Sequence, residues 1–178
     1  MPGMQTGDGS MLKYEDPTTQ IAVVLTRQVL ALFERNRQLT TNDPEAGGQL
    51  FARFDGNIAY VEEATGPRPT DLRTRFGFRP DRKAEQKEIH ERFELGLHYI
   101  GDWHTHPTDF PCPSREDIAS IRAAVNRSKH DLKGFLLIIA GNAPFPRGLF
   151  VTFETGTTGH GLRPAKRSTE SHTSEIVV

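Results

Sequence analysis

Short apolar runs and helical patterns alternate through the middle of the chain. Ile21–Leu25 is a β-branched run typical of a strand, and Thr26 directly after it can cap a helix. The apolar positions with helical spacing after this cap are Val29, Leu30, Leu32 and Phe33. Gly47–Phe54 and Ile58–Glu63 indicate two further strands, joined at Asp55-Gly56 as a β-hairpin. This part of the chain therefore predicts a strand, a helix and a hairpin in succession.

The second half of the chain continues this mixture. Residues 66–80 are rich in proline and predict a loop. Asp81 can cap a helix that ends near Gly96, and Ser114 can begin another. The remaining expected strands are Leu97–His104, the buried central strand Phe135–Ala140 and the closing strand Leu149–Phe153. Strands and helices mixed around hairpins predict an α/β fold, a single three-layer α-β-α domain with a mixed β-sheet.

Composition limits the kinds of protein this can be. The 178 residues fit one domain, at ~150 residues per domain. Residues 1–17 and 156–178 are polar, so we expect a flexible N-terminal tail and a disordered C-terminal tail around a folded unit of residues 18–155. A formal net charge of −1 favours neither nucleic acid nor an anionic membrane as a partner.

The expected compartment follows from what the sequence contains. No run approaches the ~18 apolar residues of a membrane span. Cys112 is the only cysteine, which excludes an internal disulfide and fits a reducing compartment. The first residues lack the basic and apolar pattern of a secretory signal. We therefore expect a soluble cytoplasmic protein.

One passage carries most of the candidate chemistry. His104-Thr-His106-Pro is followed by Ser114-Arg-Glu-Asp117. In an extended segment side chains alternate between faces, so His104 and His106 point the same way. Two neutral imidazoles and one carboxylate make the three-ligand zinc site that leaves a fourth position for water. The passage predicts a Zn²⁺ site with His104, His106 and Asp117 as ligands.

Structural alternatives exist for the same residues. Ser114 and Asp117 have the spacing of a capping box at a helix N-terminus, and a histidine pair can be two satisfied polar groups. Capping and metal binding are compatible, because the helix dipole keeps a first-turn carboxylate ionised. Other zinc patterns fail. His90-Glu91 has Glu94 where a second histidine is needed, and a single cysteine excludes both a four-cysteine site and a nucleobase-deaminase site.

A hydrolase also needs a base that is not a metal ligand. Glu45 opens a predicted strand, and the two glycines at 47 and 48 allow a substrate or another strand to approach closely. Glu45 is therefore the candidate catalytic base. The alternative is a solvated carboxylate in the turn after Pro44.

Together these residues resemble a known motif. Glu45, His104-x-His106-Pro and Ser114-x-x-Asp117 resemble the JAMM motif of MPN-type (JAB-domain) zinc metalloproteases, in the same order. The resemblance implies an MPN/JAB fold. It also implies that the histidines and Asp117 bind Zn²⁺, that Glu45 is the general base and that Ser114 assists the oxyanion.

Linking segments suggest a narrower likeness. Thr65-Gly-Pro, Phe76, Phe78 and Tyr99 to Pro107 are similar to JAB-type proteases of bacterial CBASS anti-phage operons. That likeness implies a deubiquitinase-like isopeptidase. Its protein substrate would be a ubiquitin-like protein, or a CD-NTase-type enzyme, conjugated through its C-terminal tail to a target protein. The alternatives are a JAB protease that matures a ubiquitin-like, sulfur-carrier or phage-tail protein by peptide cleavage, and a non-catalytic MPN scaffold.

Two further features have competing interpretations. Cys112 is expected to be a small buried filler, with a thiol near the zinc that regulates the enzyme as the alternative. The arginines of the proline-rich segment form a cluster that is expected to be solvated. They are Arg68, Arg73, Arg75, Arg79 and Arg82. The alternative is that they grip an extended substrate tail, which could add a strand at a sheet edge.

Overall fold

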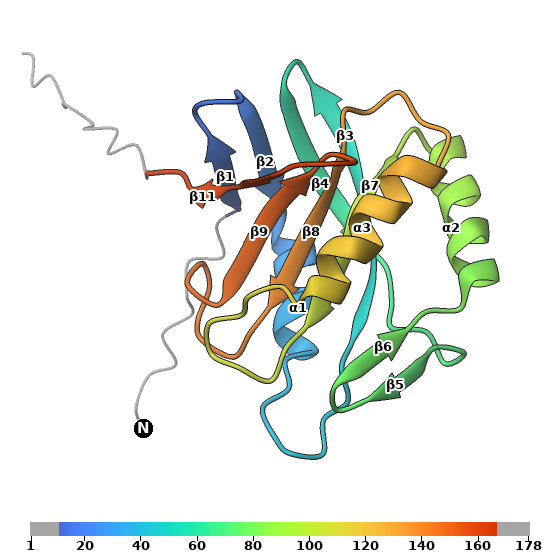
Figure 1. Ribbon diagram of the computed structural model, residues 1–178, viewed down its shortest axis with the longest axis vertical. Helices are drawn as coiled ribbons and strands as arrows, with labels where there is room; N and C mark the ends of the chain where they lie inside the picture. The colour runs from blue at the N-terminus through green and yellow to red at the C-terminus, as the bar shows by residue number, and fades with distance from the viewer. Residues whose placement is uncertain (1–10, 167–178) are drawn as a thin grey trace, which may run out of the picture.

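A curved mixed sheet forms the centre of the protein (Figure 1). The computed structural model describes residues 11–166. The strands of this sheet, in spatial order, are β10 (Gly159–Gly161), β9 (Leu149–Glu154), β8 (Phe135–Ala140), β7 (His98–Thr105), β3 (Gly47–Asp55), β4 (Ile58–Ala64), β2 (Ile21–Leu25), β1 (Leu12–Asp16) and β11 (Arg163–Pro164). The pairs β2–β4 and β7–β8 are parallel and the other pairs are antiparallel, which confirms the mixed sheet.

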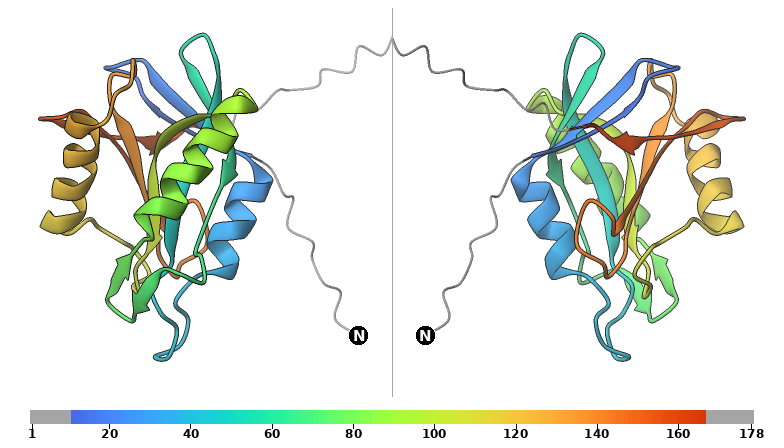
Figure 2. Two further views of the ribbon diagram at one scale, coloured as in Figure 1. Left: turned by 90° about the vertical axis from the view of Figure 1, so that its right-hand side faces the viewer. Right: turned by 90° about the vertical axis from the view of Figure 1, so that its left-hand side faces the viewer.

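Helices cover both faces of the sheet, as expected for three layers. They are α1 (Arg27–Arg35), α2 (Arg82–Glu94) and α3 (Arg115–Arg127). Side chains along β8 alternate between two apolar clusters: Leu136 and Ile138 share one with α1, whereas Leu137 and Ile139 pack with Ile121 of α3. Figure 2 shows α1 and α3 on opposite sides of the strands. The fully buried β8 matches its continuous apolar sequence.

The two edges of the sheet are joined by the end of the chain. β10 pairs with β9 at one edge, and Leu162 separates it from β11 in the sequence. β11 pairs with β1 at the other edge (Figure 1). The expected boundaries of 18–155 are therefore too narrow. Residues 12–16 and 159–164 belong to the sheet, because Tyr14 and Leu162 are buried in the core between polar neighbours. The rest of the expected tails, 1–10 and 167–178, lies outside the described residues.

The proline-rich segment is not a plain loop. It contains a small separate sheet of β5 (Leu72–Thr74) and β6 (Gly77–Arg79). Asp71 accepts hydrogen bonds from the backbone N–H groups of Arg68 and Asp81, which ties the segment to the start of α2. The Arg68 guanidinium is buried and pairs with Glu88 of α2. These contacts hold the small sheet beside the candidate site.

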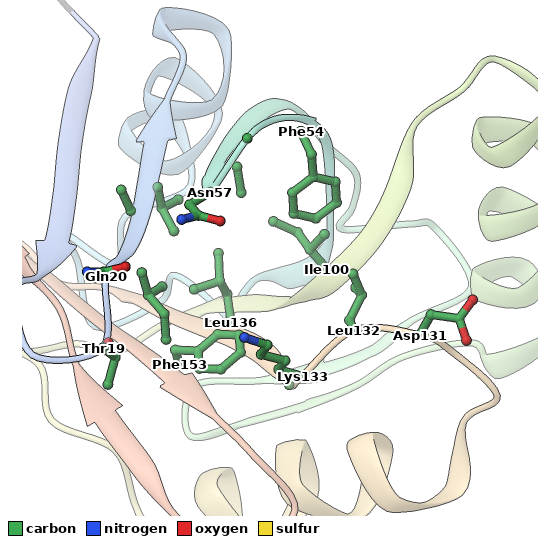
Figure 3. A pocket seen from close by; sticks show the side chains of 16 residues that line it. Thr19, Gln20, Phe54, Asn57, Ile100, Asp131, Leu132, Lys133, Leu136 and Phe153 are labelled. Carbon is green, nitrogen blue, oxygen red and sulfur yellow. The ribbon is translucent and has the colours of Figure 1, made fainter.

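A cavity of about 310 Å³ lies under the β3–β4 hairpin and the β1–β2 turn (Figure 3). Ile100, Leu136 and Phe153 line its apolar part, while Gln20 and Asn57 are among its polar residues. It contains none of the candidate site residues. Among the described residues, no helix has both the length and the apolar content that a membrane crossing requires.

Candidate metal centre

The two histidines stand at the end of β7, as the alternation predicts. The His104 and His106 Nε2 atoms are 3.1 Å apart. His104 is buried and His106 is partly exposed. Parallel pairing with β8 fixes the end of this strand, because the His106 N–H donates to the Ala140 carbonyl oxygen at 3.0 Å. The two imidazoles therefore face one point at the C-terminal end of β7.

Asp117 completes this group from the first turn of α3. Its Oδ1 lies 3.3 Å from His104 Nε2, and its Oδ2 lies 3.5 Å from His106 Nε2. Ser114 is the N-cap, and both bonds of the capping box are present: the Asp117 N–H donates to Ser114 Oγ at 3.1 Å, and the Ser114 N–H donates to Asp117 Oδ2 at 2.7 Å. The capping interpretation is confirmed, and the cap aims the carboxylate at the histidines.

The spacing of these donor atoms can be tested against a metal. Two ligands about 2.05 Å from a tetrahedral zinc ion are separated by about 3.3 Å. The two histidine nitrogens are 3.1 Å apart, and each lies 3.3 or 3.5 Å from a different oxygen of the Asp117 carboxylate, all close to that value. The donor set of two imidazoles and one carboxylate therefore fits a divalent metal such as zinc.

A second carboxylate faces the same point. Glu45 and the two histidines offer ligand atoms that all lie within 4.8 Å of one another. The alternative of a solvated turn residue is wrong, because Glu45 is almost fully buried. Its backbone is held by the small sheet: the Glu45 N–H donates to the Thr74 carbonyl at 2.7 Å, and its own carbonyl accepts from Arg73 Nε at 2.7 Å. The β5–β6 sheet therefore positions Glu45.

A buried polar network joins Glu45 to the histidines. Thr105, between them in sequence, accepts from the Ala46 N–H through Oγ1 at 2.9 Å, and this hydroxyl donates to Gln38 Oε1 at 3.0 Å. The Thr105 N–H also donates to the Ala46 carbonyl at 2.8 Å. Gln38 in turn donates to the Asp43 and Arg75 carbonyls. This network fixes the segment that carries Glu45 against the strand that carries the histidines.

The electrostatics of the two carboxylates differ. Burial raises the pKa of Glu45, an effect that the nearby imidazoles oppose and the negative charge of Asp117 reinforces. Burial also acts to raise the pKa of Asp117, but hydrogen bonds with His104 and His106 outweigh it and hold that pKa well below its usual value. Asp117 is thus suited to remain an anionic ligand, whereas Glu45 binds a proton more readily.

Close backbone packing supports the site from behind. A Cβ on Gly48 would lie 1.8 Å from the Thr65 carbonyl oxygen, so only glycine lets the chain after β4 approach β3 here. The Trp103 indole N–H donates to that same oxygen at 2.9 Å. A cavity of about 120 Å³ opens beside Glu45, His104 and Asp117, with Phe78 of β6 on its wall.

Two sequence interpretations need correction. Cys112 is exposed rather than a buried filler, because it lies in the surface loop before α3. Arg68 is buried in ion pairs and cannot reach a substrate, and Arg73 and Arg75 donate to backbone carbonyls of the segment before β3. Sequence reasoning missed the positioning residues Thr74, Thr105 and Gln38, because nothing local shows that distant segments meet at Glu45.

The family model described as prokaryotic homologs of the JAB domain matches residues 28–152, which include Glu45, both histidines and Asp117. The chain belongs to the prokaryotic JAB-domain family. Its site residues therefore lie within the shared JAB domain. A solved structure, protein DSY2949 from Desulfitobacterium hafniense, resembles it in fold, with a TM-score of 0.54 and 22% identity over 81% of this chain and 90% of that one.

Two relatives of this JAB domain carry the name CD-NTase/cGAS isopeptidase. The protein from Vibrio cholerae is 33% identical over 139 residues, which is 75% of this chain and 85% of the relative. The protein from Escherichia coli is 32% identical over 101 residues, which is 55% of this chain and 65% of the relative. The match thus spans about two thirds of the Escherichia coli relative's length.

Proposed function

We propose that this JAB domain is a zinc-dependent isopeptidase of anti-phage defence in the cytoplasm. Its substrate would be a ubiquitin-like protein, or a CD-NTase-type enzyme, joined through its C-terminal tail to a target protein. The observation that carries the proposal is the convergence of His104, His106 and Asp117, with contacts of 3.1 to 3.5 Å between their side chains and Glu45 beside them. The names of the relatives support the choice of substrate class.

In this proposal His104, His106 and Asp117 would hold the metal, which would act as a Lewis acid that acidifies water and polarises a carbonyl. Glu45 takes a proton from the attacking water and delivers it to the departing amine. The raised pKa of Glu45 suits both steps, since a base that is too weak to hold the proton could not pass it on.

Ser114 has a separate part in the proposed reaction. Its Oγ already accepts the Asp117 N–H, so its hydroxyl proton stays available for the oxygen that gains negative charge. Removal of one such donor typically lowers turnover by ~10²–10³. Asp117, held by the same cap, keeps its orientation when the hydroxyl turns.

Substitution of Glu45 separates metal binding from catalysis. The wild-type, Glu45→Ala and Glu34→Ala proteins, each loaded with Zn²⁺, are incubated with ubiquitin-like and CD-NTase conjugates, and the products are mapped by mass spectrometry. Glu34 is an exposed residue of α1 and serves as the matched control. We expect Glu45→Ala to bind zinc and to lose ~10²–10⁴ in rate, the usual contribution of general acid–base catalysis.

The identity of the cut decides between substrate classes. Release of an unmodified target lysine supports isopeptide hydrolysis, whereas a cut within a linear precursor supports the maturation of a carrier protein instead. If Glu45→Ala cleaves as fast as Glu34→Ala, then Glu45 is not the base.

A further inference from the structure

A groove leads away from the metal centre between α2 and α3. It has a volume of about 440 Å³, and Arg82, Glu85, Asp102 and Ser120 line both this groove and the cavity beside the histidines. Its floor is formed by Gln49 of β3 and Asp102 of β7. These two residues are direct partners in the β3–β7 register, so their side chains lie next to each other on the face that also carries His104.

Gln49 presents a hydrogen-bond acceptor with no donor. Its side chain is buried, at 2% exposure, and its Oε1 has no hydrogen-bond partner. Buried polar atoms are nearly always paired in native proteins, so an orphan acceptor at the floor of an open groove indicates a donor that arrives from outside.

Asp102 adds a carboxylate that lacks an ion pair. Its carboxylate accepts one hydrogen bond, from the Tyr99 hydroxyl at 2.9 Å. Within the described residues 11–166 it forms no ion pair. Glu85, on the groove wall, is also buried, and burial together with the charge of Asp102 raises its pKa to about 7. The lining thus offers several carboxylate and amide acceptors, which are suited to a donor-rich cation.

The protein's own cations do not fill this position. Arg82 pairs with Glu85 at 2.9 Å in the first turn of α2, and its side chain is 71% exposed at the rim. Arg68 pairs with Glu88 and Asp71 and also lies 4.0 Å from Glu85, but it forms no ion pair with Asp102. The Arg82 contact shows that a guanidinium fits against this wall, while Gln49 Oε1 has no hydrogen-bond partner and Asp102 has no ion pair.

We propose that the Gln49–Asp102 floor is a specificity site that binds a basic side chain of the substrate close to the bond that is cleaved. The inference rests on the proposed function. Asp102 and His104 are two residues apart on one strand, or about 7 Å, which is also the span of two residues in an extended peptide. The basic residue therefore lies about two positions from the scissile bond. Arginine suits the site better than lysine, because its planar guanidinium offers donors to both acceptors at once.

The test measures occupancy without catalysis. Zinc-loaded protein labelled with ¹⁵N is titrated with N-acetylarginine amide, and separately with N-acetylcitrulline amide, which has a similar shape but no charge. The readout is the side-chain amide resonance of Gln49, assigned by its loss in Gln49→Met. We expect the arginine compound alone to shift this resonance.

Matched variants assign the effect to the floor. Asp102→Asn should raise the dissociation constant of the arginine compound by roughly tenfold to hundredfold, as expected for a lost charge-assisted hydrogen bond. Asp55→Asn removes the same charge in the exposed β3–β4 turn and should leave the constant at the wild-type value. The proposal is overturned if arginine and citrulline shift Gln49 equally, if neither does, or if Asp102→Asn binds as well as Asp55→Asn. None of these results depends on whether the protein cleaves conjugates.

Discussion

The buried hydroxyl of Thr105 offers a sharp test of how Glu45 is positioned. Thr105→Val preserves the shape of the side chain and removes the hydroxyl, which leaves the Ala46 N–H and Gln38 Oε1 without their partner. Thr105 is completely buried, so water cannot replace the lost bonds. Each buried polar group without a partner costs about 1–3 kcal/mol. The two groups together should lower the free energy of unfolding by about 2–6 kcal/mol.

The same substitution should affect catalysis more than metal binding. The histidines and Asp117 stay attached to β7 and α3, whereas Glu45 loses part of what holds it to β7. A shift of about 1 Å in a catalytic group can cost ~10² in rate. We therefore expect Thr105→Val to retain its zinc and to lose tenfold to hundredfold in kcat.

Urea unfolding, metal analysis and kinetics on one set of proteins check this. Thr152→Val is the control, because Thr152 is a buried threonine whose hydroxyl bonds to Glu154 Oε1 and the His160 carbonyl away from the site. It should lose stability while kcat is kept. If Thr105→Val is no less active than Thr152→Val, the network does not position Glu45.

Two other predictions concern stability. Glu85 has its usual pKa of 4.5 when unfolded and about 7 when folded, so the folded state holds more protons between these values. Its contribution to the free energy of unfolding is therefore present below about pH 4.5 and is lost as the pH rises through 7, by at most about 3 kcal/mol. In urea unfolding at several pH values, Glu85→Gln should weaken this fall of the free energy of unfolding with rising pH, whereas the exposed control Glu94→Gln should leave it unchanged. The same pH dependence in both variants would contradict the raised pKa of Glu85. Gly48→Ala should lower the free energy of unfolding, measured in urea, by about 3 kcal/mol or more, because its Cβ would lie 1.8 Å from a backbone oxygen. The control Gly161→Ala has open space around the Cβ and should change this free energy by no more than about 0.5 kcal/mol. Equal losses would refute the packing argument.

The elements that depend on short sequence signals were predicted correctly. The β3–β4 hairpin, the capped α3 and the buried β8 follow from a turn dipeptide, a capping box and an apolar run. His104 and His106 share a face for the same local reason, and the cap that aims Asp117 is a contact over three residues.

The missed elements depend on distant partners. β1 is a short polar strand that pairs with β2 along its length, and β11 is a shorter one that pairs with β1 from the far end of the chain. The β5–β6 sheet carries exposed Leu72 and Phe76, so no alternation of buried and exposed positions marked it. Its role at Glu45 arises from two bonds to the Glu45 backbone, one with the Thr74 carbonyl and one from the Arg73 side chain, and neither follows from a local sequence pattern.

Metal analysis of the purified protein tests the central claim most directly. Protein prepared without chelators and offered Zn²⁺ should contain about one zinc ion per chain by native mass spectrometry and elemental analysis. His104→Ala should bind none, whereas Glu45→Ala should bind the same amount as wild type. Wild-type protein that takes up no zinc, or a His104→Ala protein that takes up as much, would contradict the assignment of His104, His106 and Asp117 as a metal centre.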